Sequence, residues 1–463
     1  MRRLDALGTA RIARLGPRAA RALVRAVEAA ERAVALYHRH RADLPPMPHP
    51  IALTPFLVPR TMLPALCRLA GLVHRLQVHA PALWQADAGG FRSLCPVSET
   101  TAEWLARPGA TRAAPWQLMI RPDVGLEAPA GRPPRPVVFE TNATALAGLY
   151  NHSAGVRILR ATVFPRIYAA AETAALQDPP DLLAVTVRWV RAAARHRGLR
   201  RIRGVAFIET PGPVDGYSEL PRMIAAFRAG GVPAVHGAPG DLRCHRGQIR
   251  LRDVPVDLVY RDLSLEEVGR PGRRAAGGVA AALEAGRCLP GAAGEFSQKG
   301  LLEALERPEV RSLFSGPERR FLAAAIPWTR VLGPRRTTDP AGRDVDLPEF
   351  ARRARERLLI KPNVGSSGTG VLLGRWCPAP RWEARIQKAL ADPGRWVVQA
   401  WRPGTRRPAA YLRRHRLRVG LVYCSLGLFY VPGELGLHCR VSGAPVVNVA
   451  RQGALACAFL TPG

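Results

Sequence analysis

The segment from Leu358 to Leu373 constrains the fold more than any other part of the sequence. An apolar run at 358–360 is followed by Lys361-Pro362, a loop rich in glycine and serine at 365–370, and a second apolar run at 371–373. The two apolar runs predict strands. Glycines let backbone N–H groups converge on an anion without interference from a Cβ atom, and hydroxyl groups add donors. The segment therefore predicts two strands joined by an anion-binding loop.

This loop differs from two common phosphate-binding motifs. It is not a P-loop, because no Gly-Lys-Ser/Thr follows the glycines, and it is not the dinucleotide fingerprint, because a strand follows instead of a helix. A loop that folds over phosphate groups remains, with an ordinary flexible hairpin as the alternative. The candidate contacts are at Gly365, Ser366, Ser367 and Gly368.

Lysine is rare in this chain, and two of its lysines lie beside such motifs. Only Lys299, Lys361 and Lys388 occur among 68 Lys and Arg residues. An ammonium group is a compact charge that suits a single phosphate oxygen in a tight site, where a guanidinium fits poorly. Lys361 ends the first strand of the loop segment, and Lys299 follows Gln298. We predict nucleotide contacts for these two lysines and an ordinary surface role for Lys388.

A second group of polar residues brackets a proline-rich insert upstream. Arg121 and Asp123 precede this insert, and Glu140 and Asn142 follow the apolar run at 137–139. Two carboxylates and one amide oxygen are ligands that Mg²⁺ prefers, with substrate phosphates completing its octahedron. Residues two apart on a strand share a face, and an arginine beside them can neutralise a transferring phosphate. An unrelated polar surface loop is the alternative.

Composition limits the classes of partner. The formal net charge is +32, which could indicate nucleic-acid binding, but the arginines are spread along the chain and only 6% of residues are aromatic. The eight cysteines are scattered without a C-x-x-C pair, which fits a reducing cytoplasm. No apolar stretch has the length of a membrane span. We expect a cytoplasmic protein with neither nucleic-acid nor membrane partners.

The order of the expected elements is typical of an α/β protein. Expected helices lie at 1–45, 62–78, 153–197, 219–229, 276–287, 298–307 and 381–390. Expected strands lie at 137–139, 205–208, 232–235, 256–260, 357–360, 371–373, 396–399, 419–430 and 445–449. The last two runs predict an antiparallel ending to the chain.

These motifs, taken in their order along residues 115–455, resemble the circularly permuted ATP-grasp enzymes. The nearest model is the synthetase domain of glutathionylspermidine synthase with its uncharacterised relatives. In ordinary ATP-grasp proteins the metal-binding carboxylates follow the lysines, whereas here the candidate ligands precede them. The resemblance implies an α/β, permuted ATP-grasp fold with a helical region at 1–114. It divides the rest into metal-ligand strands and helices at 115–200, a substrate domain at 201–290 and an ATP-binding lobe at 291–463.

The resemblance also implies a role for each matching residue. Asp123, Glu140 and Asn142 match magnesium ligands, and Arg121 matches the arginine that stabilises the transferring phosphate. ATP would be contacted by the two lysines, by the loop and by Gln399. Arg440 and Asn448 lie in segments that resemble the strands near the acceptor site.

The reaction implied is ATP-dependent amide formation, in which a carboxylate is activated as an acyl-phosphate and attacked by an amine. The substrates would be small or peptide-like acids and amines, whose identity the sequence leaves open together with the oligomeric state. A departure is the basic run at 413–418, because many relatives carry an acidic residue in place of Arg416. A catalytically inactive nucleotide-binding scaffold and a basic nucleic-acid-binding protein stay as alternatives. If this resemblance holds, the carboxylate oxygens of Asp123 and Glu140 lie roughly 3 to 5 Å apart, because each Mg–O bond is about 2.1 Å.

Overall fold

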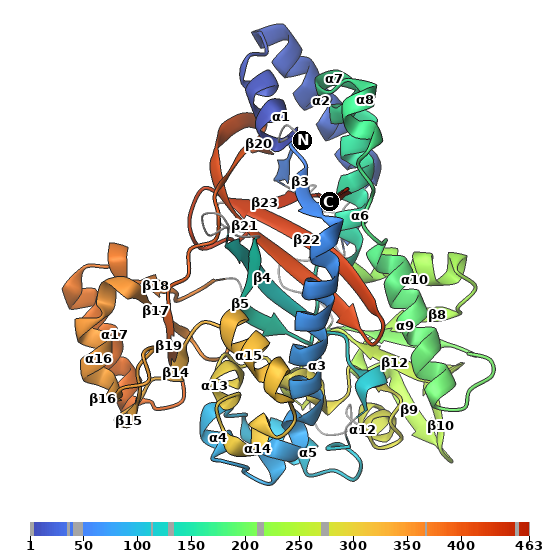
Figure 1. The fold of residues 1–463 in the computed structure, drawn as a ribbon. Helices are drawn as coiled ribbons and strands as arrows, with labels where there is room; N and C mark the ends of the chain where they lie inside the picture. Colours follow the sequence, from blue (N-terminus) through green and yellow to red (C-terminus); the bar gives the residue numbers. More distant parts are fainter. Residues whose placement is uncertain are drawn as a thin grey trace.

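A seven-stranded sheet forms the centre of the protein (Figure 1). The structure is a computed structural model that describes residues 4–34, 38–39, 50–112, 114–127, 134–210, 217–269, 277–365, 368–449 and 453–462. The order across the sheet is β20 (Arg407–Arg413), β2 (Ile51–Ala52), β23 (Gly453–Ala456), β22 (Glu434–Ser442), β21 (Arg416–Val431), β4 (Arg121–Glu127) and β5 (Arg135–Asn142). Segments from the beginning, middle and end of the chain therefore share one sheet.

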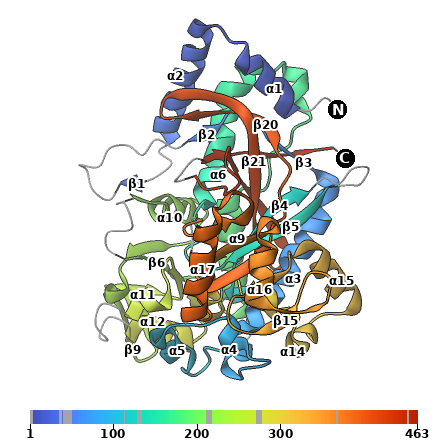
Figure 2. The ribbon, with the colours of Figure 1, turned by 90° about the vertical axis from the view of Figure 1, so that its left-hand side faces the viewer.

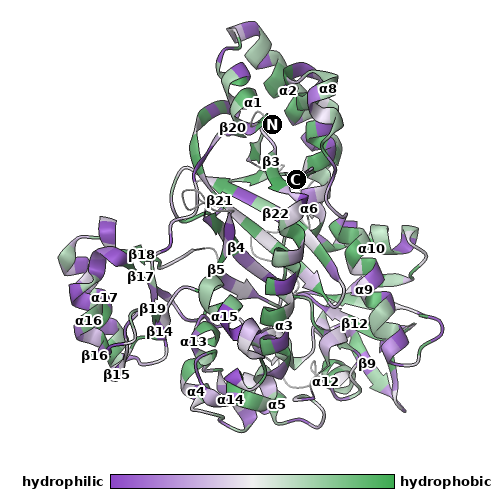
Figure 3. Cartoon of the chain, in the orientation of Figure 1, coloured by the Kyte–Doolittle hydropathy of each residue, from purple (hydrophilic) through white to green (hydrophobic). Residues whose placement is uncertain are grey.

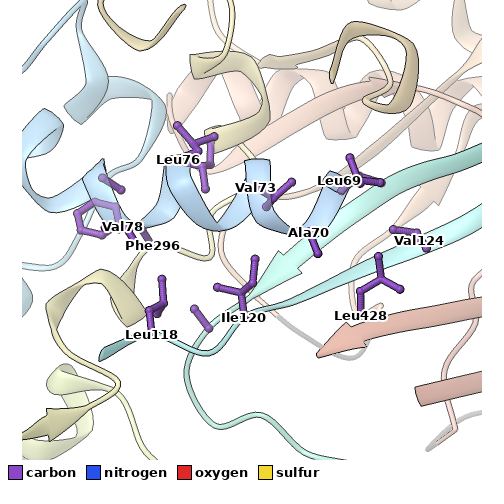
Figure 4. Close-up of a cluster of buried hydrophobic side chains, with 14 of the residues drawn as sticks. Leu69, Ala70, Val73, Leu76, Val78, Leu118, Ile120, Val124, Phe296 and Leu428 are labelled. Atoms are coloured by element: carbon purple, nitrogen blue, oxygen red, sulfur yellow. The ribbon is translucent and has the colours of Figure 1, made fainter. Parts of the chain in front are cut away.

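One face of this sheet is apolar and packs against helix α3 (Leu63–Gln85). Figure 4 shows Leu69, Ala70 and Val73 of α3 in one cluster with Val124 and Leu428 of the strands and with Ile120, which directly precedes β4. Within β4 and β21, Val124 and Leu426 are cross-strand partners, so both lie on the α3 face. Packing against α3 holds the strands in place on one face of the sheet, so polar residues can occupy the opposite face.

Two further sheets flank the centre. A parallel sheet has the order β13 (Cys288–Leu289), β12 (Leu258–Arg261), β6 (Val205–Ile208) and β8 (Ala234–Gly237). An antiparallel sheet has the order β14 (Thr329–Val331), β19 (Trp396–Ala400), β17 (Leu358–Pro362) and β18 (Leu372–Leu373). This sheet and the helices that cover it are called the second lobe below. Helices α16 (Leu347–Arg353) and α17 (Ala379–Ala391) cover this sheet, and Figure 2 views the molecule from the side of the second lobe. Lys361 and Gln399 lie on adjacent strands of this lobe.

The remaining elements surround these three sheets. The helices are α1 (Leu4–Ala13), α2 (Pro17–Val34), α4 (Phe91–Leu94), α5 (Glu99–Leu105), α6 (Leu149–Ile158), α7 (Phe164–Ile167), α8 (Ala170–Ala174), α9 (Leu182–His196), α10 (Leu220–Ala229), α11 (Leu265–Gly269), α12 (Gly277–Glu284), α13 (Leu301–Ala304), α14 (Pro308–Arg311) and α15 (Gly316–Ala325). The short strands are β1 (His38–Arg39), β3 (Phe56–Pro59), β7 (Tyr217–Ser218), β9 (Leu242–His245), β10 (Gln248–Leu251), β11 (Val254–Val256), β15 (Arg336–Thr338), β16 (Asp344–Asp346) and β24 (Ala458–Thr461). The region up to residue 114 is mainly helical, and it also supplies β2 to the central sheet.

The α/β fold class predicted from the sequence is confirmed, with local corrections. The strand predicted at 445–449 is wrong, because β22 ends at Ser442 and the next strand begins at Gly453. The strand expected at 232–235 begins at Ala234, and the helix expected at 298–307 is reduced to α13 with irregular flanks. No helix among the described residues is long and apolar enough to cross a membrane.

Candidate active site

Four of the predicted residues form a compact polar group on β4 and β5. The register pairs Arg121 with Asn142 and Asp123 with Glu140, so two cross-strand pairs lie side by side on one face. The spacing of two residues on each strand produces this arrangement, since alternate residues share a face. Figure 3 shows the hydrophilic colour on β4 and β5 in the interior of the ribbon. Cross-strand partners typically have Cβ atoms about 4.5–5.5 Å apart, which suits groups that share a ligand.

A bulge in β5 gives this group a link to the second lobe. After the pair Asp123–Glu140, the next pair is Val124–Val138, so Phe139 has no partner across the ladder. The backbone oxygen of Phe139 accepts a hydrogen bond of 2.6 Å from Nζ of Lys361. The bulge therefore presents a carbonyl group to a lysine more than 200 residues away in the chain.

Gly427 leaves the space in which the side chains of β4 lie. It is the cross-strand partner of Asp123 on β21. A Cβ atom at this position would lie 2.9 Å from Cδ of Arg121 and 3.1 Å from Oδ1 of Asp123. Glycine inside a strand often marks such a close approach. Leu426-Gly427-Leu428 is thus a sequence feature that could have pointed to the site, although the prediction treated it only as part of an apolar strand.

Asp123 is the electrostatic centre of the group. Its oxygens accept hydrogen bonds from Arg121 (Nε to Oδ1, 3.1 Å) and from Nδ2 of Asn142 (3.2 Å), and Nη2 of Arg440 lies 2.7 Å from Oδ2. The carboxylate is only 2% exposed. Burial alone would raise the pKa of Asp123, but the charges and hydrogen bonds of Arg121 and Arg440 outweigh it and hold the pKa below its ordinary value. Asp123 is therefore ionised and fully engaged.

Lys361 is buried next to this centre. Its Nζ also donates to Oε1 of Gln399 at 2.9 Å, and Gln399 donates in turn to Thr329. Desolvation lowers the pKa of Lys361 to about 7, against the opposing charge of Glu140 and together with the like charge of Lys299. An anion bound in this region would restore the charge of the ammonium group.

Lys299 joins the two lobes through the glycine loop. Its Nζ donates to the backbone oxygen of Gly365 at 2.6 Å and lies 3.3 Å from Oε2 of Glu140. Asn363 fixes this arrangement, because its backbone oxygen accepts from Lys299 N–H (3.0 Å) and its side chain accepts from Gly300 N–H (2.8 Å). Asn363 is fully buried, and its positioning role was not predicted from the sequence. A Cβ atom at Gly300 would lie 1.9 Å from the oxygen of Leu94, which explains the glycine after Lys299.

A cavity of about 140 Å³, here called the lysine cavity, lies between the central sheet and the second lobe. Its walls combine apolar side chains with a few polar groups, as is usual for small-molecule sites. Apolar and aromatic wall residues include Phe139, Leu359, Leu373, Trp401, Tyr423 and Val446. Polar wall residues include Asp123, Glu140, Lys361, Gln399, Arg440 and Asn448. The apolar run at 445–449 thus lines a cavity instead of entering a sheet.

A second, larger cavity of about 1200 Å³, here called the arginine cavity, opens beside the first. Its wall includes Arg121, Arg413, Arg414, His438, Arg440, Gln298 and Gly365. Three residues, Glu140, Arg440 and Asn448, line both cavities. The two cavities therefore meet at the polar group on β4, β5 and β22.

The structure brings the predicted residues together at this junction. Arg121, Asp123, Glu140, Asn142, Lys299, Lys361, Gly365, Gly368, Gln399, Arg440 and Asn448 all line the cavities or bond to residues that do. Ser366 and Ser367 lie outside the described residues. Wall residues that the sequence reasoning missed are Phe139, Trp401, Arg402, Tyr423 and Ser425. Nothing in their local sequence distinguishes these from core positions, since only the sheet register brings them to the cleft.

The donor set at the junction fits a magnesium ion. Two carboxylates and an amide oxygen on adjacent strands are hard ligands, and phosphate oxygens would supply the rest. Among the described residues no three His, Cys, Asp or Glu side chains gather into a metal site, so a protein-only cage is absent there. Both oxygens of Asp123 already have partners, so a metal ion bound there would compete with Arg440 and Asn142 for Oδ2. The lysine cavity combines Lys361 with apolar wall residues, a set of groups that suits a nucleotide.

Comparison with known proteins identifies a fold relative. No family profile and no curated protein matches the sequence. A solved structure of a glutathione synthetase-like effector from Globodera pallida, in its apo form, superposes with a TM-score of 0.67 at 10% sequence identity. That match covers 96% of this chain and 98% of the effector. A structure of a proposed gamma-glutamylcysteine synthetase from Methylobacillus flagellatus matches with a TM-score of 0.40 and 11% identity, over 84% of this chain and 88% of that one. The chain therefore has a glutathione synthetase-like α/β fold over nearly its whole length.

Proposed function

We propose that this protein is an ATP-dependent carboxylate–amine ligase of the circularly permuted ATP-grasp type. The observation that carries the proposal is the junction of the two cavities at Glu140, Arg440 and Asn448. One cavity offers Lys361 and an apolar wall to a nucleotide, with Lys299 beside Glu140 at the junction. The other cavity offers arginines to a carboxylate substrate. A γ-phosphate and a carboxylate would meet at this junction. The glutathione synthetase-like fold supports the same class of reaction.

In the proposed reaction, a substrate carboxylate oxygen attacks the γ-phosphorus of ATP and ADP leaves. An amine then attacks the acyl carbon, phosphate leaves, and an amide bond remains. Lys299 and Lys361 would neutralise the phosphoryl oxygens, and Arg121 would stabilise the negative charge that builds up during transfer. Asp123, Glu140 and Asn142 would hold Mg²⁺, which supplies further neutralisation of phosphate charge.

Arg440 would act on the acid substrate. Its Nη2 lies 2.7 Å from Oδ2 of Asp123, and its Nε is buried without a hydrogen-bond partner among the described residues. A carboxylate arriving from the arginine cavity would give the guanidinium a new partner, and release from Asp123 would free an oxygen for the metal. Binding of the acid and of Mg²⁺ would therefore favour each other.

The cellular setting follows from the thiols. All eight cysteines are free, and only Cys244 is fully exposed. Free thiols fit a reducing compartment, so we place the reaction in the cytoplasm. The remaining partners in the proposal are a small or peptide-like acid and an amine.

A screen for ADP release over pairs of acids and amines tests the reaction. The expected result is ADP formation that requires Mg²⁺, an acid and an amine together, with hydroxamate trapping when hydroxylamine replaces the amine. ADP formation without any acid would point to simple ATP hydrolysis. If no pair yields ADP while ATP still binds, the ligase assignment is wrong.

A nucleotide-binding scaffold without catalysis is the second candidate, and the engaged state of Asp123 favours it. The two candidates differ in their use of metal. A thermal shift with ATP that grows on adding Mg²⁺ supports the ligase, because the metal ligands then contribute. An equal shift with and without Mg²⁺ supports the scaffold.

A further inference from the structure

The hairpin between β20 and β21 ends in an unusual turn at the edge of the arginine cavity. Arg413 pairs with Arg416, so Arg414 and His415 form the two-residue turn. Both have positive φ, at 48° and 61°. Two-residue hairpin turns of this kind favour Asn-Gly, because side chains with a Cβ atom rarely adopt the left-handed region. Arg414 and His415 therefore occupy a turn in which Asn or Gly would have a lower conformational free energy.

Arg414 differs from His415 in what its side chain contacts. His415 lies 2.6 Å from Glu28 of α2, which ties the turn to the N-terminal helices. Arg414 lines the arginine cavity and makes no hydrogen bond or ion pair with any residue that the structure describes. Its neighbour Arg413 lines the same cavity and donates to the backbone oxygen of Gly453 at 2.9 Å. Arg414 thus combines an unfavourable backbone conformation with an unpaired charge at a cavity wall. This combination favours a role in ligand binding over a structural role.

The sheet register relates this turn to the reaction junction. Leu412, Ile51, Leu455 and Arg440 stand in one row across β20, β2, β23 and β22. With about 4.8 Å between strands, the row places Leu412 roughly 15 Å from Arg440, and the turn begins two residues further along the chain. The side chains of Arg414 and Arg440 extend from the backbone, so two anionic groups bound to them can lie closer together than the two backbone positions. An extended chain advances about 3.3–3.6 Å per residue, so a ligand of dipeptide to tripeptide length would span the distance between these groups.

We propose that Arg414, together with Arg413, binds a second anionic group on the acid substrate. The acid would be a dianion, with its reacting carboxylate at Arg440 and a distal carboxylate or phosphate at the turn. This inference rests on the proposed function, because it takes the group at Arg440 to be the one that is activated. It adds a requirement on the length and the charge of the acid substrate, which neither the fold nor the junction of the two cavities specifies.

Binding of simple acids to the full chain tests the proposal. Calorimetric titrations with Mg²⁺ and a non-hydrolysable ATP analogue would compare glutarate, pimelate and azelate with pentanoate, heptanoate and nonanoate, the monoanions of the same lengths. At one chain length we expect the dianion to bind at least tenfold more tightly than the monoanion, since a charge-assisted contact is added. A ω-phosphono acid of that length would show whether phosphate is preferred over carboxylate.

Variants at the turn separate recognition from stability. Arg414→Asn keeps a residue that tolerates the left-handed region, so the protein should stay folded with an unchanged or higher Tm. It should lose the tenfold preference for the dianion and keep heptanoate binding. His415→Asn changes the same turn without touching the cavity and should keep the preference.

Two outcomes would overturn the inference: equal binding of dianions and monoanions at every length, or an undiminished preference in Arg414→Asn. The thermal shift with ATP and Mg²⁺ is a separate readout. If that shift is absent while the preference for dianions persists in the wild type, the ligase proposal fails and anion binding at the turn stands.

Discussion

The two faces of the central sheet are built from the same strands and held by different forces. On one face, Val124, Leu426 and Leu428 pack against α3 and contribute through burial of apolar area. On the other face, Arg121, Asp123 and Glu140 interact through charge, and their neighbours include both lysines of the cleft. The alternation of a strand assigns each residue to one face, so stability and the proposed chemistry are separated by a single position along the chain.

This separation has one exception, at Asp123. The carboxylate is the counter-ion of two buried arginines, so an alanine there would leave two guanidinium groups unpaired. Breaking a buried ion pair typically costs about 3–5 kcal/mol. The isosteric Asp123→Asn, which keeps hydrogen-bonding atoms beside both arginines, is therefore the better variant at this position. Glu140, whose side chain is 27% exposed, is the cleaner position to test.

The largest expected effect is on turnover. Glu140→Gln removes a proposed metal ligand and leaves a side chain of the same shape, so we expect turnover to fall by about 1000-fold or more with a Tm change of a few degrees at most. Steady-state ADP release and a thermal melt measure the two quantities. Glu434→Gln on β22, which loses only an ion pair with Arg188, is the control for charge removal. Equal activity of the two variants would remove Glu140 from the site.

The next effect should appear in stability alone. Leu428 is fully buried on the α3 face, and Leu428→Ala should lower the free energy of unfolding by about 3 kcal/mol through lost burial and a cavity. Leu421 lies on the same strand with 54% exposure, and Leu421→Ala should cost less than about 0.5 kcal/mol. Urea titrations give both values. If Leu428→Ala lowers kcat in the folded protein as strongly as Glu140→Gln does, the two faces are not independent.

A substitution at Gly427 tests whether the backbone of β21 positions the charged side chains on β4. Alanine at 427 would bring a methyl group within 2.9 Å of Arg121, which must shift away from Asp123. We expect kcat to fall by about 10- to 100-fold, since small displacements of positioned groups are costly in catalysis. Gly420 lies on the same strand with nothing within 4 Å of its Cβ position, so Gly420→Ala is the matched control. Identical kinetics in both variants would show that Arg121 has no positioning role.

The sequence predicted the local elements well and their pairing poorly. The strand–loop–strand at 357–373 was recognisable because apolar runs and glycines are local features, and the structure has β17 and β18 paired there. The register that sets Asp123 opposite Glu140 depends on a bulge at Phe139, which no local pattern reveals. Candidate ligands were identified by residue type and spacing, while the wall residues near Trp401 and Tyr423 required the full topology.

The failed strand at 445–449 has a specific cause. Val446 and Val447 are apolar as a strand would require, but they line the lysine cavity. A Cβ atom at Gly368 would lie 2.5 Å from Val446, so the glycine loop and this segment touch. Apolar residues that line a cavity are of the same types as apolar residues of a core, so composition alone does not distinguish them. The actual terminal strand, β24, pairs in parallel with β3 from the beginning of the chain.

The smallest expected effect concerns the pH dependence of ATP binding. The folded protein holds the pKa of Lys361 at about 7, because burial disfavours the ammonium form. A polyphosphate should bind the protonated form, so ATP affinity should be greatest below pH 7. Above pH 7 each unit should weaken binding by up to about tenfold, until the pH reaches the pKa of the ATP-bound lysine. Titrations between pH 6 and 9 measure this slope.

Variants at Lys361 connect this slope with stability. The unfolded lysine titrates near 10.5, so between pH 7 and that value the unfolded chain binds more protons, and Lys361 should make stability rise with pH there. Lys361→Met should flatten both the stability profile and the ATP-affinity profile, and it should be the more stable protein at pH 7, where the buried charge is unfavourable. Lys388→Met, on the exposed part of α17, should leave both profiles unchanged. If wild-type affinity for ATP is constant from pH 6 to 9, Lys361 does not contact phosphate through its ammonium group, and the charged face of the sheet has a structural role at that position.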